Sequence, residues 1–275
     1  SATTNAGFDI VGASLVPYAG DYFIQLMNMI LIVFGAIGFP VLIEVKKFLF
    51  RRPKDRRWKF SLFAKLTSLT FLILIFAGAL LIFVLEYHHF FIGKSWHESL
   101  FYSLFQSVTT RNAGLATMDM NDFSVPTLLV LSVLMFIGAS PSSVGGGIRT
   151  TTFAVTVLFV YHFARGHRQI RIFNREIHQE DIIKSFLVTL MAIFLCSTAT
   201  FLLCISEPFS LTEIMFEVSS AFGTTGLSLG ITEELSLFGK TIIILLMFIG
   251  RIGIISFLLT FTRNQEEDAY HYPTE

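Results

Sequence analysis

The stretch that decides the fold is SVTTRNAGLA, residues 107–116. Two similar stretches stand far from it: SATTNAGFDI at 1–10 and AFGTTGLS at 221–228. All three contain a threonine pair shortly before a glycine, and the intervals between these glycines are nearly equal, 107 and 112 residues. The three glycines are Gly7, Gly114 and Gly226. A period of this length between apolar segments indicates duplicated membrane units.

The composition is that of a membrane protein. Of 275 residues, 53% are hydrophobic and only 15% are charged, and the mean hydropathy is +0.67. Several segments run for twenty or more residues with almost no charge, which is enough to cross about 30 Å of hydrocarbon as a helix. The predicted spans are 22–45, 62–87, 125–163 with an interruption, 182–205 and 237–262.

The charges are sorted along the chain. Lys and Arg gather in 46–65 and 165–184, so both stretches are predicted to face the cytoplasm. Acidic residues gather at the other ends of the spans, where the glycine motifs also lie. These residues are Asp9, Asp21, Glu86, Asp119, Asp122, Glu207, Glu233 and Glu234. The glycine motifs are therefore expected to face the outside.

Two shorter apolar segments, 96–108 and 211–222, precede the second and third glycine motifs. About a dozen residues cannot span the bilayer as a helix, so we expect re-entrant helices that enter and return on the outer side. Irregular backbone at membrane depth is tolerated only where protein buries it or where it lines water. The glycine motifs are therefore predicted to line an aqueous path.

A cation entering a membrane needs oxygen atoms in place of its hydration shell, and backbone carbonyls from several loops around one axis supply them. Glycine permits the backbone angles that aim such carbonyls inward. We expect the side chain of Arg111 to point away and to anchor its loop from behind, helped by carbonyls or acids of the outer mouth. The predicted cation-binding residues are Thr3, Thr4, Asn5, Ala6 and Gly7; Thr110, Arg111, Asn112, Ala113 and Gly114; and Gly223, Thr224, Thr225 and Gly226.

The span after residue 116 is interrupted by GASPSSVGGGIRTTT, 138–152. Proline and a run of glycines disfavour helix, so the chain should unwind here as a gating loop or as a passive kink. A phosphate cradle is not expected, because the GxxxxGK[ST] spacing is missing. The predicted gate residues are Gly138, Ala139, Ser140, Pro141, Ser142, Ser143, Gly145, Gly146, Gly147 and Arg251. Arg251 lies in an otherwise apolar span and is expected to hydrogen-bond loop carbonyls and to repel cations when the gate is shut.

An enzyme would need convergent acids, bases, nucleophiles or metal ligands, and the spans are nearly free of them. A non-conducting scaffold would leave the repeated glycine loops unexplained. We therefore expect a cation-translocating protein that is not an enzyme.

The pattern of span, short helix, glycine strand and span resembles the Trk/Ktr/HKT superfamily of potassium and sodium transporters, and most closely its KtrB-type membrane subunits. The resemblance implies four units around one pore, with Gly7, Gly114 and Gly226 matching the filter glycines of units two to four. It also implies an intramembrane gating loop in the third unit that an arginine at the position of Arg251 contacts. Transport of Na+, or of both ions, stays open as an alternative, because the filter residue of the first unit is not among these residues.

The predicted architecture is an all-α membrane protein whose first unit, and part of the second, are missing from this sequence. Its parts are 1–45, the end of unit two; 46–61, a basic loop; 62–164, unit three; 165–181, a second basic loop; 182–263, unit four; and 264–275, a cytoplasmic tail. The resemblance further implies a homodimer in a bacterial cell membrane, in contact with lipid and with a cytoplasmic KtrA-like ring of nucleotide-binding regulatory subunits. We expect no nucleic-acid partner, no bound cofactor and no metal site other than that of the transported K+, with Na+ as a possible activating ion.

Overall fold

A computed structural model of the chain describes residues 1–5, 7, 14–50, 60–166, 170–173, 175–254 and 256–257. Ala6 of the predicted filter, the middle of the first basic loop and the tail 264–275 lie outside these described residues.

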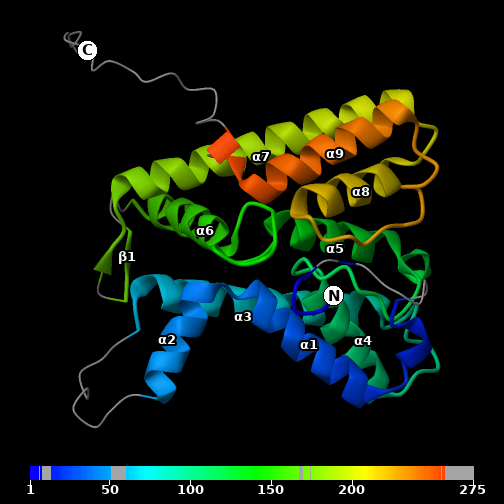
Figure 1. Cartoon of the computed structure of the whole chain (residues 1–275), viewed down its shortest axis with the longest axis horizontal. Coiled ribbons are helices and arrows are strands. Elements are labelled where there is room, and N and C mark those ends of the chain that lie inside the picture. Colours follow the sequence, from blue (N-terminus) through cyan, green and yellow to red (C-terminus); the bar gives the residue numbers. More distant parts are fainter. Residues whose placement is uncertain are drawn as a thin grey trace.

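The described residues are mostly helical, as the sequence predicts (Figure 1). The helices are α1 (Tyr22–Ala36), α2 (Phe39–Leu49), α3 (Leu62–Glu86), α4 (Trp96–Thr109), α5 (Val125–Ile137), α6 (Thr150–Ala164), α7 (Gln179–Ser206), α8 (Leu211–Gly223) and α9 (Leu237–Ile252). Two short 3-10 helices, η1 (Val16–Tyr18) and η3 (Met120–Asp122), lie in connections. An antiparallel pair of two-residue strands, β1 (Arg171–Ile172) and β2 (Arg175–Glu176), lies in the second basic loop.

Helices α3 and α7 are long and apolar enough to cross a membrane, and α1 with α2 meets the same criteria as one span bent by 106°. Helices α5 and α6 are shorter apolar helices, separated by the interruption that the sequence predicts. The two predicted re-entrant segments are α4 and α8, each one residue longer than predicted. The fold is that of a multi-pass membrane protein.

The short helices α4 and α8 begin with the same device, an S-x-x-E capping box. Ser95 and Glu98 cap α4, while Ser210 and Glu213 cap α8. In each box the glutamate accepts a hydrogen bond from the backbone N–H of its serine, at 2.9 Å and 2.8 Å. These bonds satisfy backbone groups that a helix start leaves open. The two units therefore start their short helices in the same way.

A second device joins the long helix of each of these units to the inner helix that follows. Glu86, at the end of α3, accepts hydrogen bonds from the backbone N–H and the hydroxyl of Ser124, the N-cap of α5, at 2.9 and 2.6 Å. Glu207, just after α7, accepts the equivalent pair from Ser236, the N-cap of α9. Both carboxylates are buried, and hydrogen bonds to a charged group are the stronger kind.

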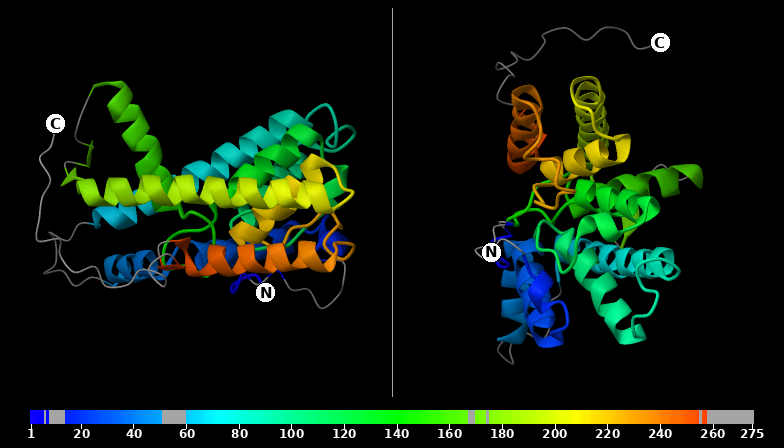
Figure 2. Two further views of the ribbon diagram at one scale, coloured as in Figure 1. Left: turned by 90° about the horizontal axis from the view of Figure 1, so that it is seen from above. Right: turned by 90° about the vertical axis from the view of Figure 1, so that its right-hand side faces the viewer.

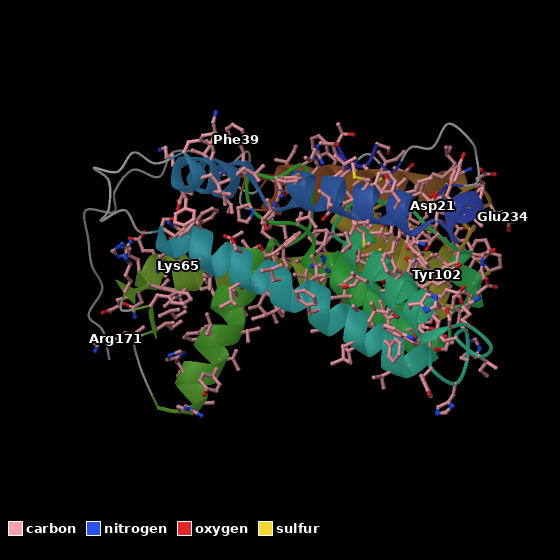
Figure 3. All side chains as sticks on the ribbon, turned by 90° about the horizontal axis from the view of Figure 1, so that it is seen from below. Asp21, Phe39, Lys65, Tyr102, Arg171 and Glu234 are labelled. Carbon is pink, nitrogen blue, oxygen red and sulfur yellow. The ribbon has the colours of Figure 1, made fainter. Side chains whose placement is uncertain are left out.

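The units stand around a central group of irregular segments. In the right-hand view of Figure 2, α1 with α2, then α3 to α5, then α7 to α9 follow one another around these segments. Buried side chains join neighbouring units: Ile32, Phe71 and Phe105 share one cluster, and Met135 and Phe216 share another. Charges mark the two ends of the long axis, with Asp21 and Glu234 at one end and Lys65 and Arg171 at the other (Figure 3).

Candidate ion filter and gate

The three motif glycines lie next to one another. A Cβ added to Gly114 would overlap the carbonyl oxygen of Thr225 and lie 3.0 Å from Gly7 Cα. A Cβ added to Gly226 would lie 3.6 Å from Gly7 Cα and 3.7 Å from Gly114 Cα. Three segments separated by more than a hundred residues of sequence therefore converge on one place. All three glycines have positive φ angles, 69°, 68° and 93°, a region that glycine enters without steric cost.

The three loops also share a second unusual backbone position. Two residues before each glycine stand Asn5, Asn112 and Thr224, with φ angles of 46°, 74° and 54°. Left-handed backbone is uncommon for residues other than glycine, and more so for a β-branched threonine. Since the same pair of left-handed positions recurs three times, the loops have the same fold as well as similar sequences.

Side-chain amides tie the first loop to the second and the second to the third. Asn5 Nδ2 donates to the carbonyl of Arg111 at 3.4 Å, and Asn112 Nδ2 donates to the carbonyl of Gly223. Arg111 and Gly223 occupy the same place, three residues before their glycines. The bonds therefore run in one direction around the centre, from one unit to the next.

Arg111 is fully buried behind the loop of its own unit. Its guanidinium donates to the carbonyls of Leu134 at 2.5 Å and Gly138 at 3.2 Å, and to the hydroxyl of Thr110 at 3.4 Å. We expected its partners at the outer mouth, and this was wrong: they lie at the end of α5. Carbonyls at a helix C-terminus carry partial negative charge, so they suit a buried guanidinium.

The remaining predicted filter residues differ in their surroundings. The hydroxyl of Thr110 donates to the carbonyl of Ser107 at 2.7 Å, and that of Thr4, an exposed residue, donates to the carbonyl of Ser1 at 3.2 Å. Ala113 and Thr225 are buried, while Ala6 is outside the described residues. Thr3 is in close contact with the inner helix, since a Cβ on Gly35 would overlap its carbonyl.

The predicted gating loop connects α5 to α6, and its two ends lie close together. Ala139 N–H donates to the carbonyl of Gly146 at 3.3 Å, and a Cβ on Gly138 would overlap that same carbonyl. Thr150 N–H donates to the carbonyl of Ala139 at 3.1 Å. The chain therefore leaves α5 and enters α6 at almost the same point.

One side of this loop lies against two of the predicted filter loops. Gly146 N–H donates to Thr224 Oγ1 at 2.9 Å, and a Cβ on Gly145 would overlap the side chain of Asn112. Thr224 and Asn112 belong to two different filter loops. Moving the loop away from Thr224 would therefore break the Gly146–Thr224 hydrogen bond.

The other side of the loop lies against the bend between α1 and α2. Ser140 N–H donates to the carbonyl of Ala36 at 3.0 Å, and Val144 N–H donates to that of Gly35 at 3.3 Å. Phe39 N–H, at the start of α2, donates to the carbonyl of Ser142 at 3.1 Å. The loop thus fills the space between the filter and a helix break of the neighbouring unit.

The arginine that contacts the loop is Arg149, and not Arg251 as expected. Arg149 Nη1 donates to the carbonyl of Gly145, and Nη2 donates to the backbone carbonyl of Arg251 at 3.5 Å. Arg251 is exposed in the last turn of α9, and its backbone carbonyl accepts the hydrogen bond from Arg149. The sequence feature that could have identified Arg149 is its position inside the glycine-rich break, GGGIRTTT at 145–152.

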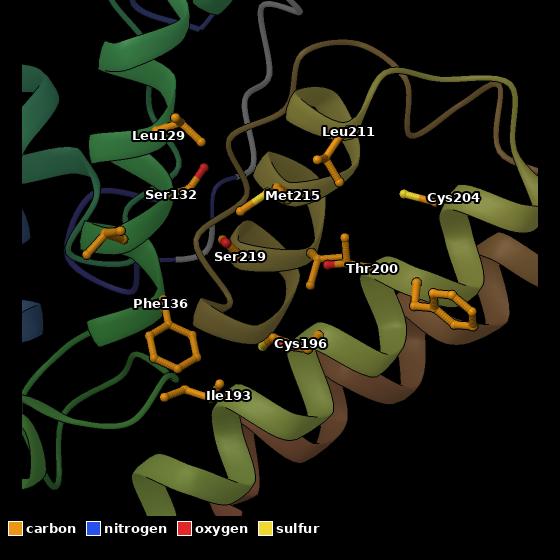
Figure 4. Close-up of a pocket in the computed structure, with 14 residues that line it drawn as sticks. Leu129, Ser132, Phe136, Ile193, Cys196, Thr200, Cys204, Leu211, Met215 and Ser219 are labelled. Carbon is orange, nitrogen blue, oxygen red and sulfur yellow. The ribbon is translucent and has the colours of Figure 1, made fainter.

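A separate cavity of about 530 Å³ lies between α5, α7 and α8 (Figure 4). Its lining is apolar or weakly polar and includes Phe136, Cys196, Thr200 and Met215. None of the filter glycines lines it, and uncharged walls of this kind do not suit a cation. It is therefore not the ion site.

Comparison with known proteins identifies the family of the chain. Residues 1–272 match the family described as TrkH, cation transport protein. Ktr system potassium uptake protein D of Bacillus subtilis (strain 168) is 58% identical over 100% of this chain and 61% of its own length. Ktr system potassium uptake protein B of the same organism is 38% identical over 99% of this chain and 60% of its own length.

Among solved structures, the potassium transporter TrkH from Vibrio parahaemolyticus superposes with a TM-score of 0.74 at 18% identity, over 95% of this chain and 56% of the other. At that identity the likeness shows the fold alone. The chain spans about three fifths of the length of the curated relatives it matches. The chain belongs to the TrkH family of cation transport proteins.

Proposed function

We propose that this chain carries the ion path of a potassium uptake transporter, in which K+ passes a filter built from the backbone carbonyls around Gly7, Gly114 and Gly226. The observation that carries the proposal is the convergence of three equivalent glycine loops on one centre. Replacing water around K+ requires several oxygens at once, and only converging loops can present them together. Helices α4 and α8 end at these loops, so the partial negative charge of their C-termini favours a cation there.

The three glycines are in contact, so an ion can pass only where the loops stand further apart. The family resemblance implies a fourth unit, and its loop would hold the other three at the required distance. One glycine in each loop offers fewer carbonyl rings than longer filters do, which predicts weaker discrimination by the filter alone.

The loop 138–149 is the gate of this path. It touches two filter loops and the α1–α2 bend, and its ends lie close enough together for it to move as a unit. Shifting it away from Thr224 would open the space directly beneath the filter.

The sidedness follows from the charges. Lys and Arg resist translocation, so the end with Lys65 and Arg171 faces the cytoplasm, and the end with Asp21 and Glu234 faces outside. The names of the two Bacillus relatives refer to a Ktr system, which supports a multi-component assembly. We infer a homodimer in a bacterial cell membrane that binds a cytoplasmic KtrA-like regulatory ring through its basic loops.

The test is cation flux into liposomes that contain the purified full-length polypeptide. We expect K+ uptake that exceeds Na+ uptake under equal gradients, and none in protein-free liposomes. Equal or faster Na+ uptake would support the sodium alternative. If the protein shows a cooperative melting transition, and so is folded, but transports neither cation, the proposed function is contradicted.

A further inference from the structure

The inner helices of the three units end close to one equivalent position, at Ala36, Ile137 and Ile252. Counting 14 residues from the N-caps Asp21, Ser124 and Ser236 leads to Gly35, Gly138 and Gly250. In the second and fourth units the sequence continues as GAIG, 35–38, and GRIG, 250–253. In the third unit, residues 139–146 are inserted, and the corresponding residues are Gly138 followed by GIR, 147–149. The gating loop is therefore an insertion of eight residues at a break that all three units share.

The last residue of each of these short stretches has nearly the same backbone conformation. Gly38 has φ 93° and ψ 136°, and Gly253 has φ 92° and ψ 140°. In the third unit the residue at this position is Arg149, with φ 76° and ψ 141°. Glycine adopts such angles freely, whereas a residue with a Cβ is strained by them. Arg149 thus occupies a backbone conformation suited to the glycine that the other two units have there.

Contacts of the same residue oppose this strain. The Arg149 guanidinium bonds the carbonyls of Gly145, inside the loop, and of Arg251, on α9. Its N–H also donates to the carbonyl of Ile137 at 3.1 Å. A cavity of about 120 Å³, lined in part by Arg149, Thr152 and Gly253, leaves the guanidinium room to move away from Gly145.

We propose that Arg149 is a strained latch, a positioning residue that holds the loop shut through its guanidinium while its backbone favours release. This deepens the proposed function and rests on it. A loop fastened by charged hydrogen bonds alone would stay shut. Strain at the same residue brings the closed and open states close in free energy, so a small rotation of α6, which begins at Thr150, is sufficient to open the gate.

Two variants separate the latch from the strain. Arg149→Ala removes the guanidinium and keeps the Cβ, whereas Arg149→Gly removes both. In liposome flux of K+ through the full-length polypeptide, we expect both variants to exceed the wild type. We expect Arg149→Ala to exceed Arg149→Gly by about fivefold, the population ratio that strain at the low end of its usual range produces. Arg149→Gly should also melt a few degrees above Arg149→Ala, because it relaxes the closed state.

Gly253→Ala is the matched control, because it places a Cβ at the equivalent break, where nothing lies within 4 Å. It should lower the melting temperature without raising flux. If the two Arg149 variants have equal K+ flux and equal melting temperatures, Arg149 is not strained. If both variants have the K+ flux of the wild type, the guanidinium does not hold the loop shut. Deletion of residues 139–146 tests separately whether the loop is a gate. Unchanged K+ flux through the deletion variant would contradict the gate of the proposed function. The melting temperatures of Arg149→Ala and Arg149→Gly would still decide whether Arg149 is strained.

Discussion

Gly114→Ala is expected to abolish cation uptake while the protein still reaches the membrane. The new Cβ would overlap the carbonyl oxygen of Thr225 and approach Gly7 Cα to 3.0 Å, so the loops of two other units would have to move. The φ angle of 68° adds strain for any residue with a Cβ. Carbonyl positions decide how well an ion is held, so a shift of a few tenths of an ångström is sufficient to lose the ion site.

The measurement is growth of a potassium-uptake-deficient bacterium at low K+, together with flux in liposomes. Gly230→Ala is the matched control: its φ is 94°, but nothing lies within 4 Å of the added Cβ, so uptake should stay near the wild-type rate. Gly226→Ala, with neighbours at 3.6 and 3.7 Å, should lie between the two. Wild-type flux through the Gly114→Ala protein would mean that this glycine does not line the ion path.

Arg111→Ala is expected to unfold the centre of the molecule and to abolish transport. The fully buried guanidinium donates to two carbonyls at the end of α5 and to a hydroxyl, and its removal would leave these acceptors unpaired beside a cavity. The cost of losing several charge-assisted bonds and of leaving buried acceptors unpaired is about 3 kcal/mol or more. The loop that carries Gly114 would lose its support from behind.

Arg111→Lys keeps the charge but cannot reach two carbonyls in the planar fork geometry of arginine. We expect it to restore part of the melting temperature and part of the flux that Arg111→Ala loses. The melting temperature in detergent and the rate of K+ flux should both be highest for the wild type, intermediate for Arg111→Lys and lowest for Arg111→Ala. An Arg111→Ala protein that melts like the wild type would contradict the anchoring role.

The sequence was sufficient for features that depend on length and spacing. Helices α4 and α8 could be predicted because segments too short to cross a bilayer stand before each glycine motif, and the break after α5 because proline and glycines interrupt an apolar run. The capping boxes that begin α4 and α8 also have a sequence signature, S-x-x-E at Ser95 and Ser210.

The arginines show what the sequence could not provide. Arg251 and Arg149 both stand in apolar, glycine-containing stretches, and composition does not say which side chain turns toward the loop. That depends on packing: Arg251 is exposed in the last turn of α9, whereas the guanidinium of Arg149 bonds the carbonyl of Gly145 inside the loop. The partners of Arg111 were missed for a related reason, because a backbone carbonyl is present at every residue and only packing selects one.

The central claim is that the carbonyls around Gly7, Gly114 and Gly226 hold the transported ion. Its most direct test is the anomalous density of Rb+, a K+ substitute, in crystals of the full-length protein. We expect a peak at the meeting point of the three loops, in contact with carbonyl oxygens from each of them, which disappears in the Gly114→Ala protein. A peak elsewhere in a protein that transports Rb+, with none at the glycines, would contradict the account.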